Sequence, residues 1–469
     1  MLGKVFKAYD IRAKYPNPLN EGTAWKIGYG TARFLLEQAK EQGQTDPMMK
    51  HVLIGRDMRP SSPDLQESLC NGIRACGAHV IDLGLVDTPF VYFAINYLDC
   101  AGGVQVTASH NPVEYNGFKI SGMRAVPIGQ VSGLEDISKY AAMADQTKTM
   151  AQDSLVMGRF EERDLWNGYQ DHVLSFLKLG SRKLKVVVDA SNGMAGTMIP
   201  KVFADIKGLK IIPLNFDNTQ GTFAHDPNPL VAANLEELRA RVVSEKADFG
   251  ICFDGDADRG IFVDEQGNIL GCDHLTAMMA STALADHPGA AIVYDLRSSR
   301  AVREEVLSHG GKPIESRVGH VFMKEKLREH EAVLGGELSG HFYFRENFNT
   351  DSGAIAFATM ASIVSASTKP LSALVAPLAR YAQSGEINFE TQEKEEAIEE
   401  LEESYGDRGD ISDLDGITVD CFESEGWWCN VRMSNTEPLL RLNLEAKNQQ
   451  LCDRIVAEIA PCLGQRVDH

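Results

Sequence analysis

Short apolar runs that lead straight into polar loops constrain the fold of this chain most strongly. The alternation of these runs with longer amphipathic stretches predicts α/β domains, in which helices cover open sheets. Ligands bind such sheets just beyond the carboxyl ends of the strands. The loops TASHNP, DASNGMAG and DLRSSR each follow one run, so we expect three related units that each present one loop. The predicted strands are residues 51–55, 80–84, 103–108, 185–190, 249–254 and 291–296.

The length of the chain and a change in its composition predict four domains. A single hydrophobic core does not grow to 469 residues. After about residue 370 the composition changes: residues 391–404 predict a charged amphipathic helix with a solvated outer face, and 431–435 and 439–446 flank a turn in a separate α+β tail. We therefore place the domains at residues 1–152, 153–267, 268–371 and 372–469.

The charge and the cysteine content indicate which classes of binding partner and which cellular compartment suit this protein. Lysine and arginine total 46 against 66 aspartates and glutamates, and the net charge of −20 makes nucleic acid and membranes poor partners. The chain has no apolar run long enough for a bilayer, and its N-terminus does not read as a signal peptide. Nine cysteines without a CxxC pair suit reduced thiols, so we expect a cytoplasmic protein. A phosphorylated ligand requires basic residues gathered in one cleft.

The segment DGDADR at residues 254–259 predicts a metal site. In an extended segment alternate side chains point the same way, so Asp254, Asp256 and Asp258 converge. Three such carboxylates repel one another unless a cation neutralises them, and all-oxygen ligands favour Mg²⁺ or Ca²⁺. Gly255 and Ala257 then leave room for an anionic ligand. An EF-hand is excluded because Arg259 stands where that loop needs glycine, and because the flanks look like strands.

Three further segments carry groups suited to a phosphosugar, although each alone also fits a plain turn. In TASHNP, Ser109 is a hydroxyl beyond a strand, and without a GxSxG elbow ordinary serine-hydrolase chemistry is excluded. GGELSGH at 335–341 supplies a carboxylate, a hydroxyl and an imidazole in alternation. RMSNTEP at 432–438, followed by Arg441, offers donors for a dianion. No P-loop and no GxGxxG occur, so nucleotide binding has no support.

Taken together and in this order, the four segments resemble the α-D-phosphohexomutase family, specifically its bacterial phosphomannomutase/phosphoglucomutase branch. TASHNP resembles the active-serine loop, DGDADR the metal loop, GGELSGH the sugar-recognition loop and RMSNTEP the phosphate-binding loop. KAYDIR at 7–12 and NGFK at 116–119 add to the resemblance, which covers essentially the whole chain. It implies three related α/β domains with mixed sheets and a fourth, TATA-binding-protein-like α+β domain. The molecule would be heart-shaped, with one loop of each domain in a central cleft.

The resemblance also implies a mechanism. Phosphorylated Ser109 would donate its phosphoryl group to a hexose monophosphate, and the resulting 1,6-bisphosphohexose would turn over and return its other phosphate to Ser109. The implied cofactors are one Mg²⁺ per chain and a hexose 1,6-bisphosphate as activator. The metal ligands would be Ser109, Asp254, Asp256 and Asp258, and the catalytic groups Ser109, His110, Lys119, Arg259 and His341. The substrate would be bound by Tyr9, Arg12, Arg297, His320, Glu337, Ser339, Arg432, Ser434, Asn435 and Thr436.

Some positions depart from the family pattern and bear on specificity. Ala13 replaces a glycine that is common in the family. Asp295-Leu296-Arg297 replaces the family's D-x-K pattern, so Arg297 presents a planar guanidinium group at a position where the family usually has a lysine. Ala257 and Leu338 differ from the DGDGDR and GEQSGH of glucosamine-phosphate mutases, so a hexose phosphate is the expected substrate. Mannose and glucose are not separated by these residues, and neither a monomer nor a dimer is favoured.

Three alternatives stay open at this stage. The first is a Mg²⁺-dependent phosphosugar phosphatase with Asp254 as the nucleophile, which would leave Ser109 without a role. The second is a phosphoglucosamine mutase of the same family. The third is a phosphosugar-binding protein without turnover.

Overall fold

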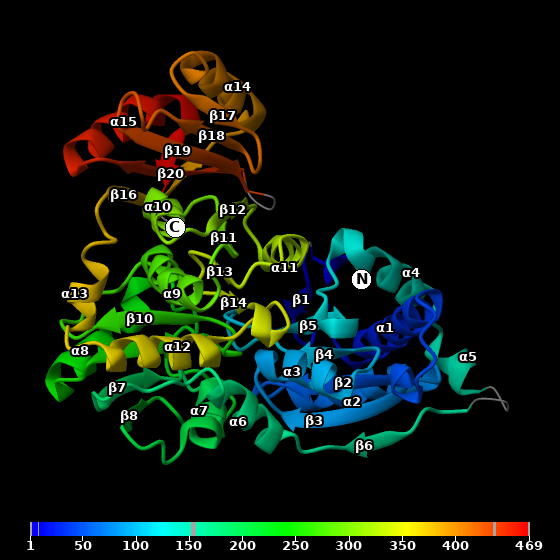
Figure 1. Cartoon of the computed structure of the whole chain (residues 1–469). Coiled ribbons are helices and arrows are strands. Elements are labelled where there is room, and N and C mark those ends of the chain that lie inside the picture. The colour runs from blue at the N-terminus through cyan, green and yellow to red at the C-terminus, as the bar shows by residue number, and fades with distance from the viewer. Residues whose placement is uncertain (1, 8, 152–155, 435–437, 468–469) are drawn as a thin grey trace. The chain divides into compact units, whose positions relative to one another are not determined.

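A computed structural model describes residues 2–7, 9–151, 156–434 and 438–467. The chain forms two compact units, and each combines segments that are distant in sequence (Figure 1). Unit 1 comprises Met1–Leu270 and Ser339–Ser372, and unit 2 comprises Gly271–Leu338 and Ala373–His469. The domain boundaries predicted near residues 152, 267 and 371 stay a prediction.

Unit 1 begins with a mixed six-stranded sheet in the order β1-β5-β4-β2-β3-β6. The strands β2, β3, β4 and β6 run parallel, whereas β5 is antiparallel to both β4 and β1. The strands are β1 (Ile11–Lys14), β2 (His51–Arg56), β3 (His79–Leu85), β4 (Gly102–Val106), β5 (Tyr115–Gly122) and β6 (Phe160–Glu162). The helices are α1 (Glu21–Glu41), α2 (Ser62–Ala75), α3 (Thr88–Leu98), α4 (Glu135–Met143) and α5 (Gln146–Met150).

The second sheet of unit 1 has the order β10-β9-β7-β8. β7, β8 and β9 are parallel, and β10 returns antiparallel to β9. The strands are β7 (Leu184–Asp189), β8 (Leu209–Leu214), β9 (Phe249–Phe253) and β10 (Gly260–Asp264). The helices α6 (Trp166–Leu174), α7 (Ala195–Phe203), α8 (Glu236–Glu245) and α12 (Gly353–Ala366) belong to this unit, as does the antiparallel pair β14 (Phe342–Phe344) and β15 (Thr350–Asp351).

Unit 2 contains a parallel arrangement β12-β11-β13 and a separate antiparallel sheet. The first consists of β11 (Ala291–Asp295), β12 (Lys312–Ser316) and β13 (Leu334–Gly336), with α9 (Cys272–Asp286), α10 (Arg300–Ser308) and α11 (His320–Glu329). The short helix α13 (Leu371–Val375) crosses the border of the units. The antiparallel sheet has the order β17-β18-β19-β20-β16-β21. Its elements are β16 (Ala382–Glu390), α14 (Lys394–Tyr405), β17 (Asp410–Ser412), β18 (Ile417–Asp420), β19 (Trp427–Met433), β20 (Leu439–Ala446), α15 (Gln449–Leu463) and β21 (Gln465–Val467).

The predicted fold class is confirmed: mixed α/β sheets are followed by a C-terminal α+β part. The apolar runs became strands because almost every side chain in them is buried, as in β4 and β9. The charged helix α14 buries only the stripe Ala397, Leu401 and Tyr405, so its remaining face meets solvent as expected. No helix in the described part of the chain is both long and apolar enough to cross a bilayer.

Candidate active site

The serine loop follows the carboxyl end of β4 and holds Ser109 in a left-handed conformation. Ser109 has φ 50 and is fully buried, and its backbone N–H donates to the Thr107 hydroxyl at 2.9 Å. Non-glycine residues adopt this conformation rarely, and it is concentrated at functional positions. The loop therefore presents one hydroxyl in a fixed direction beyond the sheet edge.

A buried arginine that the sequence did not single out holds this loop. Arg59 donates from Nη2 to the carbonyl oxygens of Ser109 and Asn111, at 2.9 and 2.6 Å, and from Nη1 to that of Pro112 at 2.7 Å. Asp57 accepts from its Nε at 3.0 Å, and the Arg59 side chain is fully buried. A guanidinium offers five donors in a fixed plane, so one side chain satisfies several loop carbonyls at once.

We expect Arg59→Lys to lower kcat about 10–100-fold and the free energy of unfolding by about 2–4 kcal/mol, because a lysine leaves buried carbonyl groups without donors. Steady-state kinetics and urea denaturation measure both effects. The exposed Arg159→Lys is the matched control. An Arg59→Lys enzyme with unchanged kcat would show that the clamp does not position Ser109.

The three predicted aspartates converge, but the extended conformation we expected for them is wrong. Residues 254–258 form a turn between β9 and β10, with Ala257 at φ 60, and the turn gathers the carboxylates. Asp254, Asp256 and Asp258 are buried, and one oxygen from each lies within 4.8 Å of the others. The expectation of strands on both sides of the acidic loop is correct, as is the exclusion of an EF-hand.

The charge of this acidic cluster suits a divalent cation. Lys119 Nζ lies 2.7 Å from Asp256 Oδ2 and 2.5 Å from Asp258 Oδ2, so one ammonium already sits among the carboxylates. Asp256 Oδ2 also accepts from the Thr88 hydroxyl at 2.5 Å, at the start of α3. Among the described residues, Asp256 Oδ1 is buried without a hydrogen-bond partner. Buried carboxylate oxygens of this kind are ligands for Mg²⁺.

Ser109 and the acidic cluster meet directly. Ser109 Oγ donates to Asp254 Oδ2 at 2.8 Å, although 145 positions separate the two residues. Gly255 permits this approach, since a Cβ there would lie 2.4 Å from the Ser109 carbonyl oxygen. Our interpretation that Gly255 leaves space for a ligand is therefore wrong: the serine loop itself fills that space. Ala257 is likewise fully buried.

His110 and Arg259 flank the serine. Arg259 Nη2 lies 2.5 Å from His110 Nδ1, which is 3.4 Å from Ser109 Oγ. The positive charge of Arg259, together with burial and Arg12, holds the pKa of His110 far below its ordinary value. His110 is therefore neutral and accepts a hydrogen bond from Arg259. Arg12 reaches the same loop through Asn111 Oδ1 at 2.5 Å.

The loop before β14 adds an imidazole. Residues 338–340 form a turn, with Gly340 at φ 86, so the extended alternation predicted for GGELSGH is wrong. His341 Nδ1 pairs with the Ser339 hydroxyl at 2.8 Å, and His341 Nε2 lies 3.5 Å from Asp258 Oδ1 and 3.8 Å from Asp351 Oδ2. This places a proton carrier at the edge of the acidic cluster.

We expect metal-free protein to lose stability as the pH rises from about 7 to about 9, a range in which His110 is neutral in both the folded and the unfolded state. Burial, with Asp258 and Asp256 nearby, raises the pKa of Asp254 from 3.8 to about 8. The folded state thus holds this proton more tightly than the unfolded state, so the stabilisation present below pH 3.8 is lost as the pH passes through about 8. Thermal unfolding in chelator measures this. Asp254→Asn should flatten the profile, and an unchanged profile in this variant would contradict the assignment.

In unit 2, three arginines gather around a glutamate that the sequence analysis missed. Glu386 Oε2 lies 3.3 Å from both Arg297 Nη1 and Arg432 Nη2, and Glu386 Oε1 lies 3.6 Å from Arg441 Nη1. Arg297 is also held by Asp295 through Nε and Nη2, at 3.1 and 3.0 Å. Asp415 also lies 3.9 Å from Arg432 Nη1, so three carboxylates face the three guanidinium groups, which remain the donors that an anion would need. The planar guanidinium group that we predicted at position 297 therefore donates hydrogen bonds to Asp295.

The remaining predicted residues lie as follows. Glu337 Oε1 accepts from the Gly319 N–H at 2.9 Å, which places it beside His320, the first residue of α11. Ser434 is buried, and its carbonyl oxygen accepts from Lys394 Nζ at 3.0 Å. Tyr9 lies half-buried in the bend before β1. Asn435 and Thr436 lie outside the described residues.

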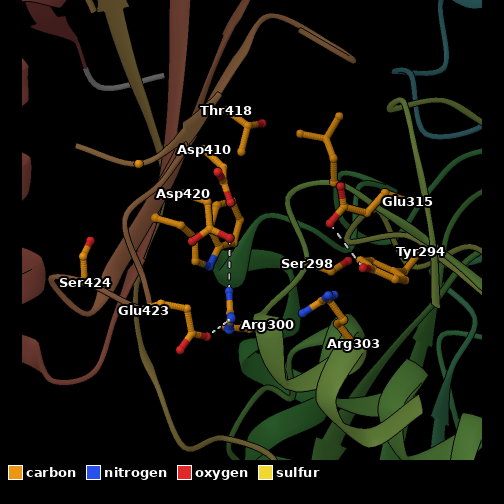
Figure 2. A pocket seen from close by; sticks show the side chains of 13 residues that line it. Tyr294, Ser298, Arg300, Arg303, Glu315, Asp410, Thr418, Asp420, Glu423 and Ser424 are labelled. Atoms are coloured by element: carbon orange, nitrogen blue, oxygen red, sulfur yellow. Dashed lines mark hydrogen bonds and ion pairs between the residues drawn. The ribbon is translucent and has the colours of Figure 1, made fainter. Parts of the chain in front are cut away.

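Unit 2 also contains a cavity of about 590 Å³ that holds none of the predicted site residues (Figure 2). Arg300 is its central side chain and pairs with Asp420 at 3.1 Å and with Glu423. Tyr294 donates to Glu315 Oε1 at 3.2 Å on the other wall. None of the three arginines around Glu386 lines this cavity.

Comparison with known proteins decides the family. Four parts of the chain match the phosphoglucomutase/phosphomannomutase family: residues 3–147 its alpha/beta/alpha domain I, 167–267 domain II, 272–381 domain III, and 386–461 its C-terminal domain. The chain belongs to this family. The resemblance stated from the sequence is therefore confirmed.

Individual members of the phosphoglucomutase/phosphomannomutase family are similar over nearly their whole length. Proteins named phosphohexose mutases from Xanthomonas campestris are 40% identical, over 94% of this chain and 95% of theirs. The phosphomannomutase of Escherichia coli K12 is 36% identical, over 94% of each chain. A solved family member from Burkholderia thailandensis superposes with a TM-score of 0.85 at 30% identity, covering 98% of this chain and 96% of that chain.

Proposed function

We propose that this chain is a phosphohexose mutase that exchanges a phosphoryl group between the 1- and 6-hydroxyls of a hexose through Ser109. The observation that carries the proposal is the 2.8 Å hydrogen bond from Ser109 Oγ to Asp254, in a cluster of buried carboxylates. A hydroxyl held against a site for a divalent ion is the arrangement that phosphoryl transfer uses. Full-length similarity to phosphohexose mutases and phosphomannomutases supports the same activity.

Ser109 would carry the phosphoryl group at the start of each cycle. A sugar hydroxyl attacks phosphorus, the bond from phosphorus to Ser109 Oγ breaks, and a 1,6-bisphosphohexose forms. After the intermediate turns over, Ser109 Oγ attacks its other phosphate and releases the isomeric monophosphate. A hexose 1,6-bisphosphate would serve as activator because it can phosphorylate Ser109 when this residue has lost its phosphoryl group.

Asp254, Asp256, Asp258 and phosphorylated Ser109 would hold one Mg²⁺. When bound, this ion supplies positive charge that stabilises the transferring phosphoryl group. Arg259 adds a fixed positive charge beside Ser109. Lys119 stays protonated because, although burial favours its neutral form, Asp256 and Asp258 raise its pKa further. His341 is hydrogen-bonded to the Ser339 hydroxyl and lies beside Asp258, and we propose that it carries the proton to and from the sugar oxygen.

The arginine cluster of unit 2 would bind the phosphate that does not react. Arg297, Arg432 and Arg441 all lie near Glu386, and a bound phosphate would take over guanidinium donors that now face carboxylates. Bidentate guanidinium contacts suit a phosphate dianion. Glu337 and Ser339 would accept or donate hydrogen bonds to sugar hydroxyls, together with His320.

Assays on hexose monophosphates test the proposal. Mannose 1-phosphate and glucose 1-phosphate, with Mg²⁺ and a catalytic amount of hexose 1,6-bisphosphate, should be converted into their 6-phosphates without release of inorganic phosphate. Glucosamine phosphates should react more slowly. Stoichiometric release of inorganic phosphate would identify a phosphatase instead, and binding without conversion would identify a non-catalytic binding protein.

A further inference from the structure

A second group of metal-ligating side chains in unit 1 lies outside the proposed active site. It consists of Asp189, His225 and Cys252, whose ligand atoms all lie within 4.8 Å of one another. Asp189 ends β7 and Cys252 lies in β9, and the two residues are partners in the parallel register of these strands. Register partners project from the same face of a sheet, so the carboxylate and the thiol are placed together by the fold. His225 comes from the loop that follows β8.

The hydrogen bonds of His225 indicate what the group is arranged for. Its Nδ1 lies 2.9 Å from the carbonyl oxygen of Asp226, which only accepts, so Nδ1 donates there. Its Nε2 lies 3.1 Å from Asp189 Oδ2. A histidine that donates Nδ1–H to a backbone carbonyl presents the Nε2 lone pair to a metal ion. Without an ion, Nε2 faces a carboxylate oxygen, and a proton carried by one of the two groups must join them.

Hydrogen bonds fix the orientation of the Asp189 carboxylate, as they do for carboxylates that bind metal ions. Its Oδ1 accepts from the Ser191 N–H at 2.9 Å and from Asn215 Nδ2 at 3.1 Å, which leaves Oδ2 directed at His225. Asp189 and Cys252 are fully buried, whereas the His225 side chain is 18% exposed. The imidazole is therefore the part of the group that meets solvent.

We propose that Asp189, His225 and Cys252 form a second metal site, for a borderline-soft divalent ion such as Zn²⁺ or Co²⁺. Thiolate, imidazole and carboxylate ligands select this class of ion, whereas the all-oxygen cluster around Asp254 selects Mg²⁺. As the sulfur–metal bond forms, the thiol proton leaves to solvent. Three protein ligands leave one position for water in a tetrahedral site. The proposal does not depend on the mutase activity.

Co²⁺ titration of the full-length protein in excess Mg²⁺ tests this site, because a cobalt–thiolate bond absorbs in the near ultraviolet and carboxylate ligands do not. We expect one equivalent of Co²⁺ to produce this band. Cys252→Ser should abolish the band, and His225→Gln should weaken Co²⁺ binding by more than the ~10–100-fold that an outer-shell partner is worth. Cys76→Ser, which removes a half-buried thiol at the C-cap of α2, is the matched control and should keep the band. Circular dichroism verifies that each variant is folded.

Two results would overturn the site. One is a wild-type protein without a thiolate band at saturating Co²⁺. In that case His225 and Asp189 form only an imidazolium–carboxylate pair, and NMR titration would give a raised His225 pKa that Co²⁺ does not change. The other is a band that persists in folded Cys252→Ser, which would assign the metal to another thiol.

Discussion

Ser109→Ala is expected to abolish interconversion of hexose 1- and 6-phosphates, with a loss of at least about 10⁴-fold in kcat. Alanine cannot carry the phosphoryl group, and no other hydroxyl replaces Ser109 Oγ in its 2.8 Å contact with Asp254. Substrate binding should change little, because the arginine cluster of unit 2 is untouched. Coupled assays in both directions measure the loss, and mass spectrometry should find no phosphate on the variant peptide.

The same variant separates the mutase from its main rival. If Asp254 were the nucleophile of a phosphatase, Ser109→Ala would leave most of the phosphate release intact and Asp254→Asn would stop it. Ser308 is an exposed serine of α10, and Ser308→Ala is the matched control that should keep wild-type activity. Retention of more than a few per cent of mutase activity in Ser109→Ala would contradict the role that we propose for this residue.

Asp256→Asn should lower kcat on the order of 10³-fold and weaken Mg²⁺ binding. Asp256 Oδ2 accepts hydrogen bonds from Thr88 and Lys119, and Asp256 Oδ1 has no hydrogen-bond partner among the described residues. Asparagine keeps the size but removes the charge, so only two charged carboxylates of the cluster would then face the ion beside the Ser109 phosphoryl group. Without metal, the variant loses repulsion among the carboxylates but also the ion pair between Lys119 Nζ and Asp256 Oδ2 at 2.7 Å.

Mg²⁺ titrations of activity and of thermal unfolding measure the two effects of Asp256→Asn. The exposed Asp217→Asn is the matched control and should behave as wild type. An Asp256→Asn enzyme with wild-type Mg²⁺ dependence would show that the ion does not bind at this cluster.

The sequence predicted those parts of the site that reside in short segments. Ser109 and the three aspartates could be named because each motif follows an apolar strand and carries one kind of chemistry. Arg59 and Glu386 could not, since their importance arises from contacts made across the fold: Arg59 reaches Ser109 from 50 positions away, and Glu386 meets Arg297 across 89. No local pattern distinguishes such residues from ordinary charged ones.

The conformation of the acidic loop was also beyond the sequence. Alternating aspartates predict convergence in a strand, and the structure reaches the same convergence through a turn with Ala257 in the left-handed region. Alanine gives no local signal for that conformation. Likewise, the role of Gly255 depends on the Ser109 carbonyl group, which comes from another sheet.

The central claim is that the Ser109 oxygen and the three aspartates share one divalent ion. A crystal of the phosphorylated protein with Mn²⁺ in place of Mg²⁺ tests this through the anomalous signal of manganese. We predict one peak within about 2.0–2.3 Å of oxygens from Asp254, Asp256, Asp258 and the Ser109 phosphoryl group. A peak bound instead by Asp258, His341 and Asp351, out of reach of Ser109, would contradict the account.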